Sequence, residues 1–286
     1  MNNLPSVIYI VGSGRSGTTI VLEAMDAAVS GMTAVPRLAG RIPQSAILVS
    51  LMRRFGLGPH SWRRPSAEST AIFSEAGITQ DKQVALQGRP MQLDDVGDRA
   101  ANIFRSRINQ IRRWTKSPSV IIKNTASCAR IPMLSEFYPE ANFIEVIRHP
   151  TAVVSSLVKS SFWSTMVLWW DGRTTQEYCS DHGISDYELA ARHWNTQVLT
   201  LRDGLKAVPD HRKVCIRYED FVVNPAGILS QAGYPNLDHA ALKSLNIRKL
   251  RELSTYATSI WNAVESECSE GMQTLGYELT ASGIAQ

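Results

Sequence analysis

The sequence predicts a single α/β domain whose central, mostly parallel β-sheet is flanked by helices. Short apolar, β-branched runs at 7–11, 119–122, 142–147 and 213–216 alternate with segments of helical spacing, which is typical of βαβ units. The 286 residues, 44% of them hydrophobic, can fill one such core. Because no repeat, low-complexity linker or composition break divides the chain, we expect one domain over 1–286.

The N-terminal part predicts a strand, a helix and then an insertion. Residues 7–11 form a buried strand closed by glycines, and 18–29 supply apolar positions at helical spacing. Four prolines interrupt 32–68, so we expect only short pieces there, with helices at 42–55 and 92–115. The stretch of roughly 32–116 is therefore expected to be a helical insertion in the domain.

From residue 117 the alternation becomes regular. Further helices are expected at 130–137, 150–160 and 186–208, and at about 225–233, 238–248 and 255–268.

The loop GSGRSGTT, residues 12–19, matches two phosphate-binding templates. Gly12, Gly14 and Gly17 spell the dinucleotide fingerprint G-x-G-x-x-G, but an NAD site also needs an acid about 20 residues on, and residues 27–67 contain none. An NADP-dependent Rossmann reductase stays open as an alternative, with Arg37 as the partner of a 2′-phosphate.

The second template is the P-loop, with Thr18 where its lysine belongs. Without that lysine, and with no acid after the strands at 122 or 147, the usual groups for a nucleoside triphosphate and its magnesium are missing. A phosphate cradle is left, made of backbone N–H groups, the hydroxyls of Ser16, Thr18 and Thr19, and the Arg15 guanidinium.

Three further groups follow predicted strands. Lys123 ends the strand that begins at 119, Arg148 ends the strand 142–147, and Tyr218 follows the strand 213–216. Arg148 and Ser156 could grip one phosphate from two sides, and Tyr218 could stack on a base or sugar. A solvated strand end, a capped carbonyl and core packing are the structural alternatives for Lys123, Arg148 and Tyr218.

In this order and spacing, the four motifs resemble the sulfotransferases that use 3′-phosphoadenosine 5′-phosphosulfate (PAPS), and the ending CSEGMQTLGYE resembles bacterial members. The resemblance implies a P-loop NTPase-like fold and in-line sulfuryl transfer to a hydroxyl or amine of a small-molecule acceptor, with 3′-phosphoadenosine 5′-phosphate (PAP) as product and no metal. Its implied donor site comprises Gly14, Arg15, Ser16, Gly17, Thr18 and Thr19 for the 5′-phosphosulfate, Arg148 and Ser156 for the 3′-phosphate, and Tyr218 for the adenine. Arg15 and Lys123 would assist the transfer.

The general base is not fixed by the resemblance. Some members have a histidine two residues after the lysine, where this sequence has Thr125, and others carry an acid where it has Pro36 and Arg37. His60 is the one conventional base between Asp26 and Glu68, so it is a candidate. Glu68, Asp94 and Asp95 are comparable candidates.

The net charge of +4 hides a strong asymmetry. Residues 27–67 and 99–135 contain 14 Lys and Arg and no acid, while the rest of the chain holds 16 bases and 26 acids. An anionic acceptor is one interpretation, and a solvated basic face is the other. A non-catalytic nucleotide- or nucleic-acid-binding module is a third possibility.

Targeting and metal signals are missing from the sequence. The N-terminus has no basic segment typical of a signal peptide, no apolar run approaches the roughly 18 residues of a membrane helix, and the four cysteines form no C-x-x-C pair. We therefore expect a cytoplasmic enzyme without a metal site, a nucleic-acid partner or a membrane partner.

Overall fold

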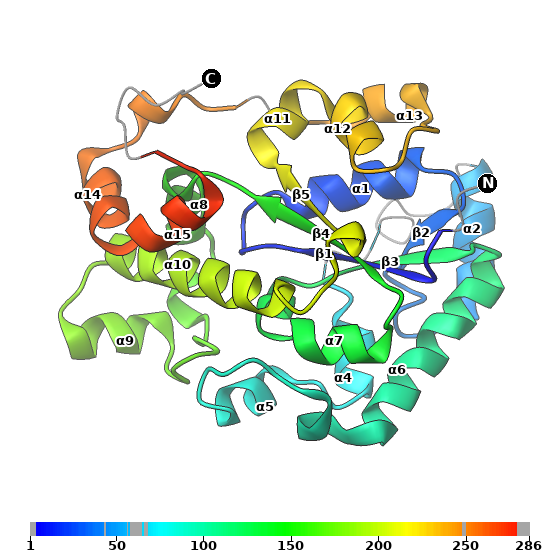
Figure 1. Cartoon of the computed structure of the whole chain (residues 1–286), viewed down its shortest axis with the longest axis horizontal. Coiled ribbons are helices and arrows are strands. Elements are labelled where there is room, and N and C mark those ends of the chain that lie inside the picture. Colours follow the sequence, from blue (N-terminus) through cyan, green and yellow to red (C-terminus); the bar gives the residue numbers. More distant parts are fainter. Residues whose placement is uncertain are drawn as a thin grey trace.

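Five parallel strands form one sheet at the centre of the molecule, in the order β2-β3-β1-β4-β5 (Figure 1). The computed structural model describes residues 4–42, 44–55, 57, 65, 68–247 and 250–278. The strands are β1 Val7–Val11, β2 Met32–Ala34, β3 Ser119–Lys123, β4 Asn142–Ile147 and β5 Lys213–Arg217. The sequence predicted all of these but β2, which is too short to show a period.

Alternation along β1 divides the core between the two faces of the sheet. All five residues of β1 are buried, because the strand lies between β3 and β4. Val7, Tyr9 and Val11 pack in one apolar cluster, whereas Ile8 and Ile10 pack in another on the opposite face. A third cluster surrounds Trp194 beyond the sheet. The expected α/β architecture is confirmed.

Helices cover both faces of the sheet (Figure 1). In chain order they are α1 Thr18–Ala28, α2 Ser45–Phe55, α4 Thr70–Glu75, α5 Gln80–Ala85, α6 Leu93–Thr115, α7 Ile131–Phe137, α8 Pro150–Val158, α9 Thr175–His182, α10 Asp186–Leu205, α11 Tyr218–Val223, α12 Pro225–Gln231, α13 His239–Lys243, α14 Thr258–Glu267 and α15 Ser269–Leu275. Every helix expected from the sequence is present, and α2, α4, α5 and α6 occupy the predicted insertion between β2 and β3. In the part of the chain listed above, no helix has the length and apolarity to cross a membrane.

The carboxyl ends of the strands meet at one edge of the sheet, because all five strands are parallel. From this edge β1 leads into the glycine-rich loop, β3 ends at Lys123, β4 leads to Arg148, and β5 leads to Tyr218. The fold therefore brings to one edge the motifs that the sequence singled out.

Candidate functional site

The glycine-rich loop turns tightly between β1 and α1. A Cβ atom on Gly17, whose φ is +94°, would lie 2.2 Å from the Tyr218 ring, and one on Gly12 would lie 2.4 Å from the Val146 carbonyl oxygen. The Ser13 and Ser16 hydroxyls hydrogen-bond each other, and the Gly14 N–H donates to Gln197 Oε1 at 3.1 Å. The glycines thus hold the loop close to the strand ends.

The start of α1 suits an anion. No side chain caps the helix at Gly17, and its first turn contains no acid. Backbone N–H groups at such a terminus carry a partial positive charge. Thr18 is buried and Thr19 half-buried beside them. The groups of the predicted cradle thus lie together at the helix start, and their binding of a phosphate stays a prediction.

Arg15 is the point where the donor-site motifs meet. Its Nε donates to Ser156 Oγ at 2.9 Å, and its carbonyl oxygen accepts from Arg148 Nη1 at 3.1 Å. The loop after β1, the residue after β4 and the helix α8 thus meet at Arg15, whose side chain is exposed.

Arg148 has an unsatisfied donor beside this junction. Its guanidinium lies over the Tyr218 ring, 4.4 Å from the ring centre, while its buried Nε has no hydrogen-bond partner among the residues that the structure describes. A buried N–H without an acceptor is unfavourable, so an anion that accepts from it would be bound favourably. Since one face of Tyr218 is covered by Arg148, the adenine contact would use another part of the ring, and that assignment stays a prediction.

Lys123 is held by Glu68, a residue of the insertion. Lys123 is only 3% exposed, and its Nζ forms an ion pair with Glu68 Oε1. The other carboxylate oxygen accepts from the backbone N–H of Thr125 at 2.8 Å and from its hydroxyl at 3.1 Å. The Glu68 side chain keeps 39% of its surface exposed, so it could still reach a bound molecule.

The structure therefore separates the base candidates. Glu68 lies beside Lys123, and Thr125, which stands where some relatives have a histidine, is hydrogen-bonded to it. Asp95 instead pairs with Arg89 and accepts from the Gln92 N–H at the start of α6; the hydrogen bond from Arg89 is the main cause that lowers its pKa. His60 lies outside the described residues, so its role stays a prediction. No sequence motif marks Glu68, which is simply the first acid after the acid-free stretch.

His149 is part of the scaffold. Its Nδ1 accepts from the Thr151 N–H at 3.3 Å, and its backbone N–H donates to Glu219, which also accepts from the Tyr277 hydroxyl at 3.1 Å. Burial lowers the pKa of His149 from its usual value near 6.5 to about 4. A neutral imidazole that caps α8 fixes the direction of the chain after Arg148.

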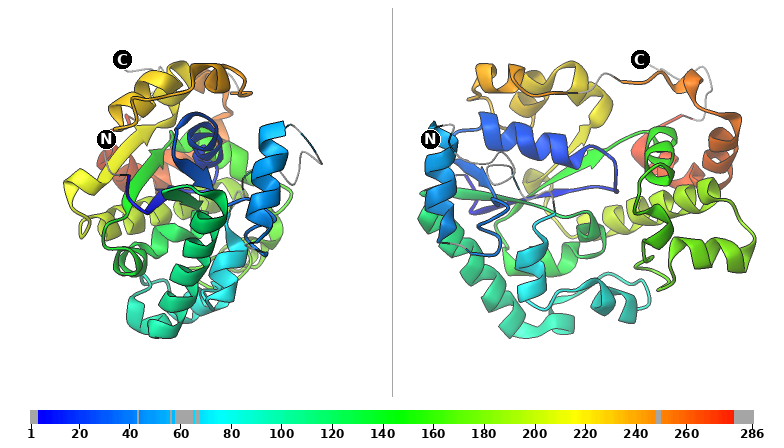
Figure 2. Two further views of the ribbon diagram at one scale, coloured as in Figure 1. Left: turned by 90° about the vertical axis from the view of Figure 1, so that its right-hand side faces the viewer. Right: turned by 180° about the vertical axis from the view of Figure 1, so that it is seen from behind.

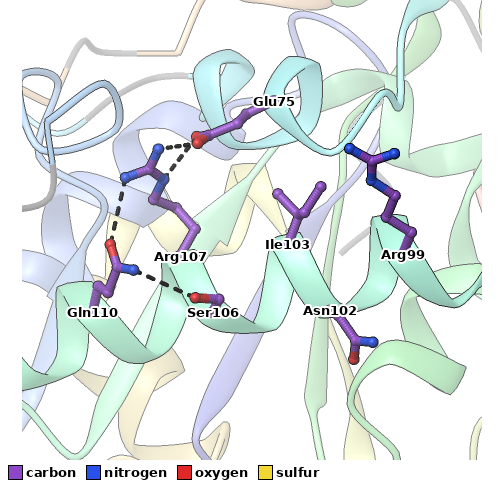
Figure 3. A pocket seen from close by; sticks show the side chains of 7 residues that line it. All are labelled: Glu75, Arg99, Asn102, Ile103, Ser106, Arg107 and Gln110. Carbon is purple, nitrogen blue, oxygen red and sulfur yellow. Dashed lines mark hydrogen bonds and ion pairs between the residues drawn. The ribbon is translucent and has the colours of Figure 1, made fainter.

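A separate open pocket of about 590 Å³ lies on α6, away from the strand ends (Figure 3). Arg107 crosses it to bind Glu75 of α4, and its Nη1 reaches Gln110 at 3.5 Å. None of the predicted site residues that the structure describes lines this pocket. Within the described ranges, no group of three or more His, Cys, Asp or Glu side chains could hold a metal ion.

Curated proteins and solved structures with similar sequence or fold are sulfotransferases. The chain is 26% identical over 243 residues to the omega-hydroxy-beta-dihydromenaquinone-9 sulfotransferase Stf3 of Mycobacterium tuberculosis and of Mycobacterium bovis; the matched region is 78% of this chain and 60% of each relative. The chain thus spans 60% of the length of these relatives.

Among solved structures, STF9 from Mycobacterium avium superposes with a TM-score of 0.59 at 14% identity, over 96% of this chain and 78% of the other. The sulfotransferase domain of the curacin biosynthetic pathway superposes with a TM-score of 0.53 at 17% identity, over 98% and 100%. At such identities the likeness concerns the fold, which is P-loop-like as expected.

The model of a protein family described as "Sulfotransferase family" matches residues 5–232 of this chain. That match runs from β1 into the segment after α12 and includes the glycine-rich loop, Lys123, Arg148, Ser156 and Tyr218. With the same motifs gathered at one edge of a parallel sheet, the chain belongs to the sulfotransferase family.

Proposed function

We propose that this protein transfers a sulfuryl group from PAPS to a hydroxyl or amine of a small-molecule acceptor. The observation that carries the proposal is the junction at Arg15, where the loop, Ser156 and Arg148 meet beside an uncapped helix start. Family membership supports the reaction class. The names of the Stf3 relatives support a small-molecule acceptor.

The donor would lie along the strand ends. The loop from Gly14 to Thr19 would hold the 5′-phosphosulfate, since it offers N–H groups, hydroxyls and one guanidinium without a nearby acid in the first turn. Arg148 and Ser156 would hold the 3′-phosphate, which could satisfy the buried Nε of Arg148. Tyr218 would bound the adenine.

Bound PAPS supplies a sulfuryl group: a bond forms between the acceptor atom and sulfur, and the bond from sulfur to the phosphate oxygen breaks, which leaves PAP. Arg15 and Lys123 are the cations of this chain that would face the charge developing on the leaving oxygen. Glu68 would accept the proton from the acceptor, because its carboxylate is fixed beside Lys123 and partly exposed. Glu68 thus becomes the preferred base among the candidates, while His60 stays a prediction.

Ligand binding and transfer test the proposal together. PAP should raise the melting temperature, by the equivalent of about 2.7 kcal/mol at a hundredfold excess over its Kd, while NADP and an oligonucleotide should not. Labelled sulfuryl transfer should then be measured against a panel of alcohols, phenols, amines and anionic small molecules.

Lys123→Met should lower turnover about a hundredfold or more. Lys206→Met, which removes an exposed lysine paired with Asp203, is the matched control and should leave turnover unchanged. Stabilisation by NADP alone, or wild-type turnover in Lys123→Met, would overturn the proposal.

A further inference from the structure

The insertion carries an apolar surface that is exposed in the folded chain. We define the α2 face as Ile47, Leu48 and Leu51 of α2 together with Ile42 and Leu57 on either side of it. Their exposed fractions are 42%, 49%, 49%, 54% and 61%. Phe55, at the end of the same helix, is 63% exposed. Single exposed apolar side chains are ordinary, but such a cluster within sixteen residues marks a contact surface.

The opposite side of α2 explains how the helix is held. Ala46, Val49 and Met52 are buried and recur at helical spacing, and α2 packs against α6. Both flanks of the helix are therefore apolar, one turned to the protein and one to the outside. In Figures 1 and 2, α2 stands at the periphery of the molecule in every view, so the α2 face is an outer surface.

The sequence segment that carries this face has charges of one sign only. Residues 27–67 contain six arginines and no Asp or Glu, and two of these arginines, Arg37 and Arg41, are exposed just before Ile42. An exposed row of Leu and Ile beside cations is the pattern of helices that lie in the interface of an anionic bilayer. With 11 residues, α2 is far too short to span a bilayer, which needs about 20.

The same charge disfavours a second copy as the occupant. In a two-fold dimer through this face, each copy would present the same surface to its partner. The two acid-free segments would then be placed against each other with like charge, which is unfavourable. An anionic lipid surface has the complementary charge.

We propose that the α2 face docks this protein on the surface of an anionic membrane, with Leu48 and Leu51 entering the headgroup boundary and the neighbouring arginines pairing with lipid phosphates. This departs from the expectation of no membrane partner, which rested on the lack of a spanning segment and did not consider surface docking. The docking does not depend on the proposed reaction.

Vesicle flotation of the full chain tests the docking. The wild-type protein should float with vesicles of phosphatidylcholine and phosphatidylglycerol, more weakly at high salt, and should not float with phosphatidylcholine alone. Leu48→Ser with Leu51→Ser should lower the bound fraction at limiting lipid about tenfold or more. The matched control is Phe162→Ser with Val223→Ser, which removes two exposed apolar side chains elsewhere, 45% and 77% exposed, and should float like wild type.

Three outcomes would overturn the proposal: wild-type protein that floats with neither vesicle, flotation that ignores phosphatidylglycerol and salt, and a double α2 variant that floats like wild type. A wild-type dimer that the α2 variant converts to a monomer, without vesicle binding, would assign the face to a second copy instead. Both double variants should keep the wild-type melting temperature and PAP affinity. A change in flotation then reports on membrane docking and not on folding or on the proposed reaction.

Discussion

At the scale of single residues, Arg15 combines an unusual backbone conformation with two hydrogen bonds to other residues of the candidate site. Its φ of +67° lies in the left-handed region, which is unfavourable for a residue with a Cβ atom by about 1 kcal/mol. The hydrogen bonds to Ser156 and from Arg148 hold it there. A glycine at this position would remove the backbone strain, but it would also remove the positive charge. An arginine here therefore indicates that the guanidinium is needed at this place.

Gly17 allows the loop to approach Tyr218, so Gly17→Ala should weaken donor binding. The added Cβ would lie 2.2 Å from the Tyr218 ring at a φ of +94°, so the loop or the ring must move. We expect PAP affinity to fall about tenfold or more, as measured by calorimetry.

Gly77→Ala is its control, since Gly77 has a similar φ of +72° and no atom within 4 Å of the added Cβ. It should lower stability by about 1 kcal/mol and leave PAP binding unchanged. Equal PAP affinity in Gly17→Ala and wild type would contradict the close approach of the loop to Tyr218.

Glu68→Gln should separate chemistry from donor binding. The amide keeps the shape of the side chain but cannot accept a proton, so we expect kcat to fall by about a hundredfold or more while the PAP-induced shift in melting temperature stays the same. Glu75→Gln is the control, since Glu75 also pairs with a cation of residues 99–135, Arg107, but both residues line the separate pocket on α6. A kcat in Glu68→Gln equal to that of Glu75→Gln would remove Glu68 as the base.

At the scale of elements, the parts of the fold with a clear period were predictable. The strands β1, β3 and β4 are buried along their whole length or nearly so and appear as apolar runs, and α6 and α10 are long enough to show one apolar face. β2, α4 and α5 span three to six residues, less than a full pattern, so tertiary packing defines them. The helix α9 was not predicted, although the residues of its capping box, Thr174 and Glu177, stand at the spacing T-x-x-E in the sequence.

The site was predictable to the same extent. Parallel strands must end at one edge, so Arg15, Lys123 and Arg148 could be placed together from sequence alone. The contact between Glu68 and Lys123 could not, because it joins the strand to a segment of the insertion that has no period. The link from α10 to the loop through Gln197 was likewise invisible, since a glutamine on a helix carries no such signal.

α10 is expected to position the loop through that glutamine. Gln197 accepts from the Gly14 N–H at 3.1 Å, and Asn195 of the same helix accepts from the Gly271 N–H at 2.8 Å. Gln197→Leu should therefore raise the KM for PAPS about five- to tenfold with a smaller change in kcat, since one hydrogen bond to the loop is lost. Asn195→Leu should lower stability without changing that KM. If Gln197→Leu lowered stability and left the KM for PAPS unchanged, α10 would support the loop only through packing.

At the scale of the whole molecule, the charge asymmetry divides into parts with different partners. In the acid-free residues 99–135, three cations have partners within the protein. Lys123 pairs with Glu68, Arg107 pairs with Glu75, and Arg105 donates to the carbonyls of Phe137 and Glu136. Lys123 thus ties the insertion to β3, Arg107 ties α6 to α4, and Arg105 ties α6 to α7. Other cations are exposed: Arg37 and Arg41 in residues 27–67, and Arg99, Arg113 and Lys116 in residues 99–135. Both segments therefore present cations that an external anion would meet.

Two buried histidines should make the protein sensitive to mild acid. Burial lowers the pKa of His193, whose Nδ1 accepts from Trp170 Nε1 at 3.1 Å, to about 4, as it does for His149. An unfolded histidine titrates near 6.5. Between pH 6.5 and 4 the unfolded chain therefore binds protons that the folded chain does not, so the free energy of unfolding falls as the pH falls.

The two histidines together should make the free energy of unfolding change by about 2.7 kcal/mol per pH unit, in addition to the contributions of the carboxylates. Glu145 acts in the opposite direction, because burial raises its pKa, so the comparison must be made between variants. The free energy of unfolding should be measured in urea between pH 7 and 4.5. In His193→Gln, whose amide oxygen can still accept from Trp170, its slope against pH should lose about half of the histidine contribution. His239→Gln, at an exposed position, should keep the wild-type slope. Equal slopes in His193→Gln and wild type would mean that His193 is protonated in the folded protein, and that the core around Trp170 is more hydrated than its burial indicates.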